Sequence, residues 1–369
     1  MNPELYERYL AKKAKKLGIS VEELKAQGAA NQTGSQATKP EGCRADVWQF
    51  NDNNIEKTDL KPQSANSNTS IPSYLHTSNN ALSPSVKDNR ENKFALIGYP
   101  LGHSLSKVIH EAGFKSMGIS AVYDILETPP ETLVDRIKYL KNNGYKGFNV
   151  TIPLKLPVSL FVNDVDRYAN LAGAINTVYI NEDKTLVGYN TDVIGFKNAI
   201  PFDIDLSGKR VGILGTGGAA HAACVALSEC GVNTLDFFTR SIPNSIELMN
   251  YVRRIFPSIT FNVYQIENIR NLCEYDMLVN TTPIGMLGKS GDMTPVEEDA
   301  LRTLKQGAIV YDVIYNPKKT VLIKLAEKLG YRTITGLDML IHQAVSAQKI
   351  WLGGLPDFKD MKISALEAL

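Results

Sequence analysis

The feature that most constrains the fold is a regular alternation of short apolar segments with amphipathic ones, which begins at Lys93. The segments typical of strands are KFALIG (93–98), AVYDILE (121–127) and KGFNVTI (146–152), and those with helical spacing are SLSKVIHEAGFKSMG (104–118) and PETLVDRIKYLKNNG (130–144). A helix between two strands carries the chain back to the edge of the sheet where the next strand begins. The sequence therefore predicts an α/β fold with a mainly parallel sheet.

The same alternation starts again at KRVGILG (209–215), after GAINTVYI (173–180) and LVGYN (186–190). The later strands are expected at TLDFF (234–238), MLVNTT (277–282), AIVYDVI (308–314) and YRTITG (331–336). The change from the first series to the second falls near Gly195 to Pro201. Since 369 residues suffice for two domains, we expect two α/β units.

The first 92 residues have a different composition. Residues 1–27 carry apolar side chains at roughly helical spacing, and we predict a short helical segment there. Residues 28–92 are rich in Asn, Gln, Ser, Thr, Pro and Lys, so they cannot bury enough apolar surface to offset the entropy of ordering. We predict a disordered linker over 28–92. Two interpretations of residues 1–27 stay open, a docking segment for an unknown partner and a dispensable extension.

Composition argues against several classes of function. The net charge of +1 gives no electrostatic reason to expect nucleic acid or an acidic membrane surface as a partner. The four cysteines show no CxxC spacing, which argues against a metal site or a disulfide framework. The chain has no apolar run of about 18 residues and no secretory signal at its N-terminus. We therefore expect a cytoplasmic protein without a metal ion.

The segment VGILGTGGAAHAACVALSECG (211–231) combines a strand, a glycine-rich turn and a helix. Gly215, Gly217 and Ala220 fit the pattern G-x-G-x-x-G/A. Such glycines allow a tight turn and a close approach of the backbone to a pyrophosphate, which then lies at the positive end of the helix. In this context the turn predicts a dinucleotide-binding site. The residues expected to contact the dinucleotide are Gly215, Thr216, Gly217, Gly218 and Ala219.

The residues after the next strand indicate which dinucleotide is bound. An acidic residue there suits the ribose 2′-hydroxyl of NAD, whereas an arginine suits the 2′-phosphate of NADP. The sequence DFFTRS (236–241) places Thr239, Arg240 and Ser241 at the strand end, while Asp236 lies in the middle of the strand. NADP is therefore the expected cofactor, and NAD is the alternative.

Eight short motifs follow one another in the structured part of the chain. They are GYPLGHSLS (98–106), NVTIPLK (149–155), GAINT (173–177), GYNTD (188–192), GTGGAA (215–220), NTTPIGM (280–286), YDVIYNP (311–317) and GLDMLIHQA (336–344). In this order they resemble those of the shikimate dehydrogenase family, from about Phe94 to the C-terminus. The resemblance implies a substrate-binding domain of residues 93–198 and 336–369, with a Rossmann-like NADP-binding domain, residues 199–335, inserted between them. It also implies the reversible NADPH-dependent reduction of 3-dehydroshikimate to shikimate in aromatic amino-acid biosynthesis.

The resemblance further implies that Lys155 and Asp192 form the catalytic pair. Hydride transfer to a ketone leaves a developing alkoxide, and a positioned ammonium group can supply its proton. A neighbouring carboxylate can orient that ammonium and hydrogen-bond to the hydroxyl that is made or consumed. These two residue types therefore suit the reaction that the family performs.

Several polar residues would surround the substrate, as the resemblance implies. Ser104 and Ser106 would bind the substrate carboxylate with the help of Tyr315, although serines before a helix are also frequent N-caps. The residues expected around the ring hydroxyls are Thr151, Asn176, Gln343, Lys155 and Asp192. Val313 and Gly336 would border the nicotinamide of the cofactor.

Two other functions stay open. Family members commonly have a second basic residue four positions after the strand-end arginine, and this chain has Asn244 there. A quinate/shikimate dehydrogenase that uses NAD is therefore one alternative. A non-catalytic metabolite sensor on the same fold is the other, and the presence of both Lys155 and Asp192 argues against it. The oligomeric state stays open, with a homodimer as one alternative.

Overall fold

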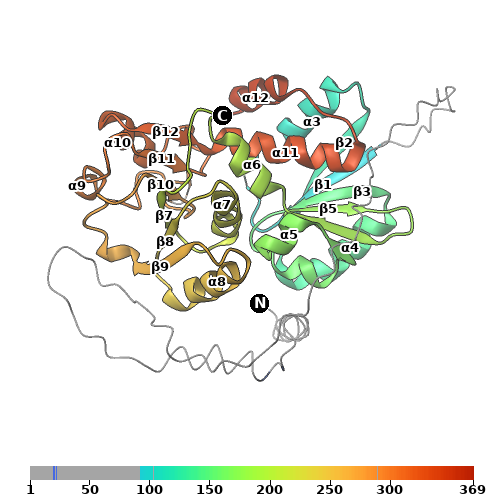
Figure 1. The fold of residues 1–369 in the computed structure, drawn as a ribbon. Helices are drawn as coiled ribbons and strands as arrows, with labels where there is room; N and C mark the ends of the chain where they lie inside the picture. The colour runs from blue at the N-terminus through green and yellow to red at the C-terminus, as the bar shows by residue number, and fades with distance from the viewer. Residues whose placement is uncertain (1–19, 21, 23–91, 103, 289) are drawn as a thin grey trace, which may run out of the picture. The chain divides into compact units, whose positions relative to one another are not determined.

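The structure of the protein is a computed structural model that describes residues 20, 22, 92–102, 104–288 and 290–369. The helical segment predicted for 1–27 and the linker predicted for 28–92 lie outside the described residues, apart from Ser20, Glu22 and Asn92. Asn92 is already the first residue of a strand, so this strand begins one residue earlier than predicted. Residues Asn92–Leu369 belong to one compact unit, which contains two six-stranded sheets (Figure 1).

The first sheet has the strand order β2-β1-β3-β5-β6-β4. Its strands are β1 (Asn92–Gly98), β2 (Ala121–Glu127), β3 (Tyr145–Val150), β4 (Asp164–Val165), β5 (Thr177–Ile180) and β6 (Leu186–Tyr189). Strand β1 pairs in parallel with β2 and with β3, as the alternation predicts. Strands β1 and β3 are buried along nearly their whole length, which is typical of parallel strands with helices on both faces.

Alternate residues of β1 pack against different helices. The helical elements of this half are α3 (Ser106–Ser116), η2 (Pro130–Thr132), α4 (Leu133–Asn142), η3 (Pro157–Leu160) and α5 (Arg167–Ala172). Phe94 lies in a buried cluster with Phe114 of α3, whereas Ile97 lies in another with Leu133 of α4. Because side chains alternate between the two faces of a strand, the apolar run KFALIG supplies both clusters at once.

Strand β5 differs from the prediction of a mainly parallel sheet. It runs antiparallel to both of its neighbours, β3 and β6. The connection from β5 to β6 is closed by a hydrogen bond from the Asn181 N–H to the Thr185 carbonyl (2.9 Å), with Lys184 at a φ of 66°. So short a connection forms a hairpin, because a parallel pair needs a crossover of a dozen or more residues. The sheet thus follows the expected pattern at β1, β2 and β3, and the hairpin extends it at one side.

The second sheet has the order β12-β11-β10-β7-β8-β9, and every neighbouring pair in it is parallel. Its strands are β7 (Arg210–Leu214), β8 (Thr234–Thr239), β9 (Thr260–Gln265), β10 (Met277–Asn280), β11 (Ile309–Asp312) and β12 (Arg332–Thr335). This is the doubly wound order of dinucleotide-binding folds, with β7 as the central first strand. The edge strand β9 was not among the predicted strands, while the other five were.

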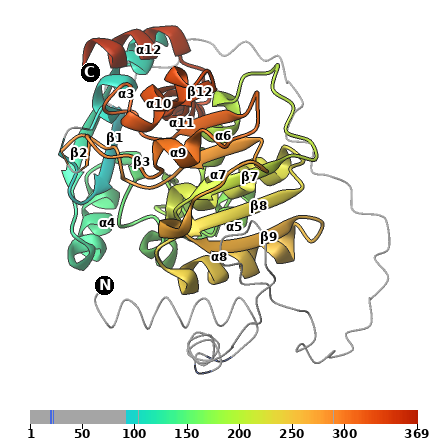
Figure 2. The same ribbon diagram turned by 90° about the vertical axis from the view of Figure 1, so that its left-hand side faces the viewer.

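The helices of the second half are α7 (Gly218–Glu229), α8 (Ile242–Ile255), η4 (Ile266–Asn268), α9 (Glu298–Leu301) and α10 (Val321–Lys328). Helix α8 contacts β8 and β9, and Figure 2 shows it running alongside them. Helix α7 is apolar on nearly all sides, with Ala222, Val225 and Leu227 fully buried, because it is covered by other elements as well as by the sheet.

Three further helices complete the unit, namely α6 (Thr191–Ala199), α11 (Gly336–Leu352) and α12 (Phe358–Glu367). Helices α6 and α11 lie side by side (Figure 1). A Cβ atom on Gly195 of α6 would lie 2.6 Å from the carbonyl oxygen of Met339 in α11, so only glycine permits this approach. The close contact brings the first turn of α6 next to α11, where several predicted site residues lie.

Two features of the described residues bear on the functional classes considered above. None of their helices is long and apolar enough to cross a membrane. They also contain no group of three or more His, Cys, Asp or Glu side chains that could hold a metal ion. Cys224, Cys230 and Cys273 are free thiols.

Candidate active site

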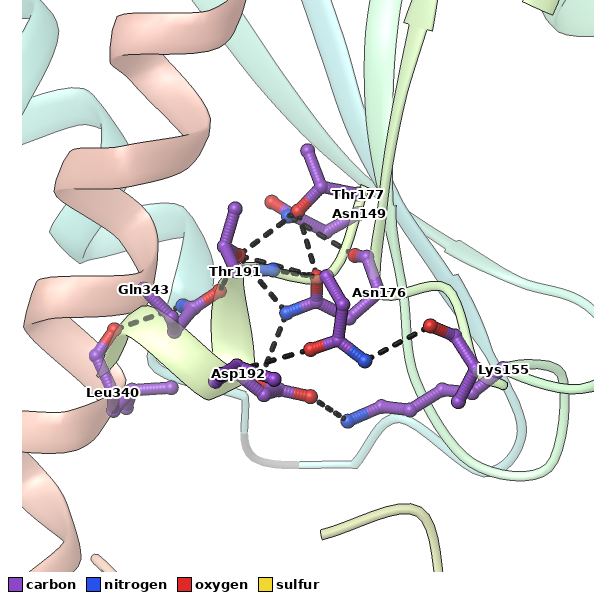
Figure 3. Close-up of polar contacts among 11 residues, drawn as sticks. Asn149, Lys155, Asn176, Thr177, Thr191, Asp192, Leu340 and Gln343 are labelled. Carbon is purple, nitrogen blue, oxygen red and sulfur yellow. Dashed lines mark hydrogen bonds and ion pairs between the residues drawn. The ribbon is translucent and has the colours of Figure 1, made fainter. Parts of the chain in front are cut away.

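Lys155 and Asp192 form an ion pair, although they lie on different elements. The distance between Lys155 Nζ and Asp192 Oδ2 is 2.6 Å (Figure 3). Lys155 follows β3, where a turn closed by a hydrogen bond from Leu154 N–H to the Thr151 carbonyl (2.8 Å) takes the chain out of the sheet. Asp192 is the second residue of α6. The two side chains are 17% and 11% exposed, so the pair is largely shielded and still accessible.

Asn176 holds the other side of the carboxylate. Its Nδ2 donates a hydrogen bond to Asp192 Oδ1 (2.8 Å), so each carboxylate oxygen has a donor of its own. The neighbouring Ile175 N–H donates to the carbonyl of Lys155 (2.9 Å). The loop before β5 is therefore tied both to the lysine and to the aspartate. The structure thus brings together three of the residues predicted from the sequence, Lys155, Asn176 and Asp192.

Gln343 reaches the same network from α11. Thr191 Oγ1 donates to Gln343 Oε1 (3.4 Å), and Gln343 Nε2 donates to the carbonyl of Leu340 (2.8 Å). The side chain is 8% exposed, and Figure 3 shows it beside the first turn of α6. Gln343 is therefore the fourth predicted residue that the structure places at this network.

Three further side chains belong to the network and were not predicted, namely Asn149, Thr177 and Thr191. All three are buried. Asn149 Nδ2 donates to Thr177 Oγ1 (2.9 Å), and the Thr191 N–H donates to Asn176 Oδ1 (2.7 Å). Each lies inside one of the motifs, directly beside or close to a predicted residue. That position was the only signal available, because the sequence does not show that three separate motifs meet in the interior.

Ser104 and Ser106 are hydrogen-bonded to each other at the start of α3. Ser104 Oγ donates to Ser106 Oγ (3.1 Å) and accepts from the Ser106 N–H (3.2 Å). The N-cap residue is Leu105, so neither serine is the N-cap. Tyr315 packs against the cluster that contains Leu105, and burial raises the pKa of its phenol. Among the described residues, no hydrogen bond joins Tyr315 to the two serines, and none joins any of the three to the Lys155–Asp192 pair.

Thr151 is held beside the end of β1. Its N–H donates to the Ile97 carbonyl (2.9 Å). A Cβ on Gly98 would lie 2.4 Å from Thr151 Cγ2, so a residue with a side chain at position 98 would displace the threonine. Gly98 is the last residue of β1 and the first of the motif GYPLGHSLS, which explains why this strand ends in glycine.

The glycine-rich turn lies at the carboxyl end of β7, the central strand of the second sheet. Gly215 has a φ of 96°, a value that favours glycine, and a Cβ there would lie 3.0 Å from Thr281 Oγ1 and from Thr282 Cγ2. Gly217 is the N-cap of α7 without a capping side chain, and no atom lies within 4 Å of where its Cβ would be. The start of α7 is therefore open beside Gly217 and has no capping side chain, and this arrangement fits the pyrophosphate of a dinucleotide.

The same turn lies next to the Lys155 side chain. A Cβ on Gly218 would be 3.3 Å from Lys155 Cδ. Gly218 is the first residue of α7, so the start of this helix and the Lys155–Asp192 pair are neighbours.

Thr239, Arg240 and Ser241 connect β8 to α8, as predicted. The Ser241 N–H donates to Thr239 Oγ1 (3.0 Å), which shapes the connection, and the Arg240 side chain is exposed. Asp236, in the middle of β8, is fully buried and accepts hydrogen bonds from Arg210 Nε (2.8 Å) and Tyr275 OH (2.8 Å). Asp236 is therefore a structural residue and does not reach the strand end.

Val313 and Gly336 are in direct contact. A Cβ on Gly336 would lie 2.1 Å from the Val313 carbonyl oxygen, so α11 begins directly against the residue after β11. The preceding Asp312 is fully buried and accepts hydrogen bonds from Thr320 Oγ1 (2.7 Å) and Asn280 Nδ2 (3.1 Å). Burial raises the pKa of Asp312 to about 6. The junction between β11 and α11 is thus tightly packed at the place predicted for the nicotinamide.

Comparison with known proteins agrees with this arrangement. Residues 96–178 match the family model of the shikimate dehydrogenase substrate-binding domain. The chain is 38% identical over 267 residues to an NADP(+) shikimate dehydrogenase of Caldanaerobacter subterraneus subsp. tengcongensis, which covers 72% of this chain and 93% of that protein.

Solved structures are similar as well. The shikimate 5-dehydrogenase of Thermus thermophilus in complex with NADP(H) and shikimate is 30% identical with a TM-score of 0.66, over 75% of this chain and 100% of that one. The 5-ketofructose reductase of a Gluconobacter species is 31% identical with a TM-score of 0.69, over 76% and 100%. The identity to the Caldanaerobacter enzyme extends over most of both chains, and the fold is shared with the Thermus enzyme. The chain therefore belongs to the shikimate dehydrogenase family.

Proposed function

We propose that this protein catalyses the reversible NADPH-dependent reduction of 3-dehydroshikimate to shikimate, a step of aromatic amino-acid biosynthesis. The observation that carries the proposal is the 2.6 Å contact between Lys155 Nζ and Asp192 Oδ2 beside Gly218 of the glycine-rich turn. The name of the Caldanaerobacter relative and the ligands of the Thermus structure support this substrate and cofactor.

The roles of the two charged residues follow from the chemistry of a ketone reduction. When bound, NADPH supplies the hydride that reduces the carbonyl carbon. Lys155 donates a proton from Nζ to the oxygen that gains negative charge, and in the oxidation direction it accepts the proton of the hydroxyl. Asp192 keeps the ammonium in place through Oδ2, while Asn176 holds Oδ1.

The substrate-binding residues are proposed on the same basis. Ser104, Ser106 and Tyr315 would bind the carboxylate, because the two serines lie together at the start of α3, Tyr315 packs against the cluster that contains Leu105, and each offers a hydroxyl group. The residues proposed for the ring hydroxyls are Thr151, Asn176, Gln343, Lys155 and Asp192. A substrate with one carboxylate and several hydroxyls requires such a dense set of polar partners.

The cofactor contacts are proposed from the second sheet. The pyrophosphate would lie against the turn Gly215–Ala219, and the 2′-phosphate against Arg240 with Thr239 and Ser241. Val313 and Gly336 would border the nicotinamide. This division supports a substrate domain of 93–198 with 336–369 and a cofactor domain of 199–335.

The experiment that tests the function is a steady-state assay of the purified protein. Oxidation of shikimate and of quinate would be measured with NADP and with NAD. Reduction of 5-ketofructose would be measured with NADPH and with NADH. We expect a strong preference for shikimate with NADP. Comparable rates with quinate and NAD would favour the alternative of a quinate/shikimate dehydrogenase that uses NAD, to which Asn244 points. A folded protein that binds ligand but turns over none of these substrates would be a sensor.

Three further properties are proposals that the assay does not address. We expect the enzyme to work in the cytoplasm and to form a homodimer, and residues 1–27 to be either a docking segment or a dispensable extension. Gel filtration of the full chain and a version that lacks residues 1–27 would test the last two.

A further inference from the structure

A row of buried hydrogen bonds leads from Tyr123, on β2, to the carboxylate of Asp192. The Tyr123 hydroxyl donates to Asn149 Oδ1 (2.7 Å), and Asn149 Nδ2 donates to Thr177 Oγ1 (2.9 Å). Thr177 Oγ1 donates to Asn176 Oδ1 (3.1 Å), and Asn176 Nδ2 donates to Asp192 Oδ1 (2.8 Å). All five residues are buried, the first four with at most 5% of their surface exposed, and Figure 3 shows the last four side by side.

In the two hydrogen bonds from Tyr123 to Thr177, the donor is each time the residue nearer to Tyr123. Burial raises the pKa of the Tyr123 phenol well above its ordinary value, so the hydroxyl keeps its proton and acts as a donor. It occupies Asn149 Oδ1 and thereby turns Nδ2 of the same amide towards Thr177. Thr177 Oγ1 accepts there, and its own proton lies near two acceptors, Asn176 Oδ1 (3.1 Å) and Thr191 Oγ1 (3.0 Å), of which the second can also be the donor.

In the second half of the row, the Asn176 amide is held jointly by the Thr177 side chain and by the backbone of Thr191. Asn176 Oδ1 accepts from Thr177 Oγ1 and from the Thr191 N–H (2.7 Å), so its Nδ2 is the group that faces Asp192. If the Asn176 side-chain amide were rotated by 180°, its Oδ1 would face the Asp192 carboxylate. Two acceptors repel each other in a buried site. The carboxylate would then move away from its place against Lys155.

We propose that Tyr123 is a positioning residue, which acts through Asn149 to orient the Asn176 amide and so holds Asp192 against Lys155. This inference rests on the function proposed above. Tyr123 contacts neither Lys155 nor Asp192, and its influence passes through the amides and hydroxyls between them. Neither the motifs nor their spacing point to Tyr123, which lies outside all eight of them.

The ring of Tyr123 is fixed independently of its hydroxyl. It stacks on His110 with a centroid distance of 4.2 Å and an interplanar angle of 6°, and Trp351 lies at 6.4 Å. A change of Tyr123 to Phe therefore removes the hydrogen bond and retains the packing. Tyr145 provides a matched control, because its hydroxyl also donates to a side chain within the same sheet, Asp124 Oδ2 (2.6 Å), away from the row.

The test compares Tyr123→Phe with Tyr145→Phe in the full chain. Both changes remove one hydroxyl, and we expect similar losses in Tm. Only Tyr123→Phe should lower kcat for shikimate oxidation, by about tenfold, with the KM for NADP unchanged. A purely structural role of Tyr123 would lower Tm and leave kcat of the folded protein as in Tyr145→Phe.

A second pair of variants keeps the test informative if Tyr123→Phe folds poorly. Thr177→Val removes the hydroxyl at nearly constant volume, and Thr177→Ser restores it. We expect the Ser variant to recover most of the kcat that the Val variant loses. Equal kcat in Tyr123→Phe and Tyr145→Phe, or equal loss in both Thr177 variants, would overturn the positioning role while the function stands. If the unaltered protein oxidises no shikimate, the function and the inference fall together.

Discussion

At the scale of single residues, the surroundings of Lys155 are what support the chemical role proposed for it. A lysine after a strand is common, and NVTIPLK alone does not distinguish it. The structure places its Nζ at 2.6 Å from Asp192 Oδ2 and its Cδ beside the start of α7. The lysine is therefore held by a carboxylate next to the glycine-rich turn.

Lys155→Ala is expected to lower kcat by about 10²- to 10⁴-fold, because the developing alkoxide loses its proton donor. The KM for NADP should change little, since the turn at Gly215 is untouched. Steady-state kinetics of the variant would be compared with those of Lys146→Ala, in which an exposed lysine bonded to Asn92 is removed from the same strand region. A Lys155→Ala enzyme that keeps most of its kcat would show that the proton comes from elsewhere.

Because of Asp312, we expect the free energy of unfolding of the protein to depend on pH. Burial raises the pKa of this carboxyl from 3.8 to about 6, so the native state binds the proton more tightly than the unfolded chain does. The stabilisation from Asp312 is therefore fully present below a pH of about 4 and is lost as the pH rises through about 6. Asp312→Asn stays neutral, so the free energy of unfolding of the variant relative to the wild type should rise over this range by up to about 3 kcal/mol.

Urea unfolding of both proteins at several pH values would measure this difference. Asp203→Asn is the control of opposite sign, because Arg332 lowers the pKa of the exposed Asp203. The contribution of Asp203 is present above its ordinary pKa and is lost as the pH falls. Parallel stability curves for wild type and Asp312→Asn would mean that Asp312 is ionised in the native state as readily as in the unfolded chain.

At the scale of elements, the site depends on how closely α6 approaches α11. Asp192 lies in the first turn of α6 and Gln343 lies on α11, and Gly195 allows the two backbones to meet. Gly195→Ala should destabilise the protein by about 1–3 kcal/mol, because the added Cβ would press on the Met339 carbonyl. It should also lower kcat, since the helix that carries Asp192 is displaced.

Thermal unfolding and kinetics of Gly195→Ala would be compared with those of Asn198→Ala, a change at an exposed position of the same helix. The control should match the wild type in kcat and gain or lose little stability. If Gly195→Ala behaved like Asn198→Ala, the approach of α6 to α11 would have no part in placing Asp192.

The elements themselves could be predicted to different degrees. Strands β1, β2 and β3 follow directly from apolar runs between helical segments, and five of the six strands of the second sheet were predicted. The antiparallel direction of β5 was not predicted. It depends on the hairpin at Asn181–Thr185, and an alternation of strands and helices gives no sign of a hairpin. Strand β9 was also missed, since it is an edge strand with an alternating, half-exposed pattern rather than an apolar run.

At the scale of the whole described unit, the two sheets are connected by packed helices rather than by a free linker. Helix α11 begins directly after β12 of the second sheet and packs on α3, α6 and α12. Helix α6 in turn packs on α7 of the second half. Unfolding of one sheet would expose the helices that cover the other, so we expect a single cooperative transition.

NADP should therefore raise the Tm of the entire unit. At a concentration of about 100 Kd it adds about 2.7 kcal/mol to the free energy of unfolding, which corresponds to a rise of about 4–5 °C for a unit of this size. Differential scanning calorimetry with and without NADP would measure the shift. Two transitions, of which NADP moves only one, would show that the sheets unfold separately.

The sequence alone determined the class of fold, the order of the motifs and the choice of the residues proposed to carry the chemistry. It could do so because strand and helix periodicity, the glycine-rich turn and the motifs that contain Lys155 and Asp192 are local patterns, readable within short windows. The resemblance of the motifs to a known family then gave each of these residues a role.

Only the tertiary structure decided which of these residues meet and what holds them. The contact of Lys155 with Asp192, the closeness of Gly218 to the lysine, and the path from Tyr123 through Asn149 join segments that lie far apart in the chain. Their distances depend on the packing of α6 against α11 and on the hairpin of β5 and β6, and packing across a core has no periodic signature in the sequence.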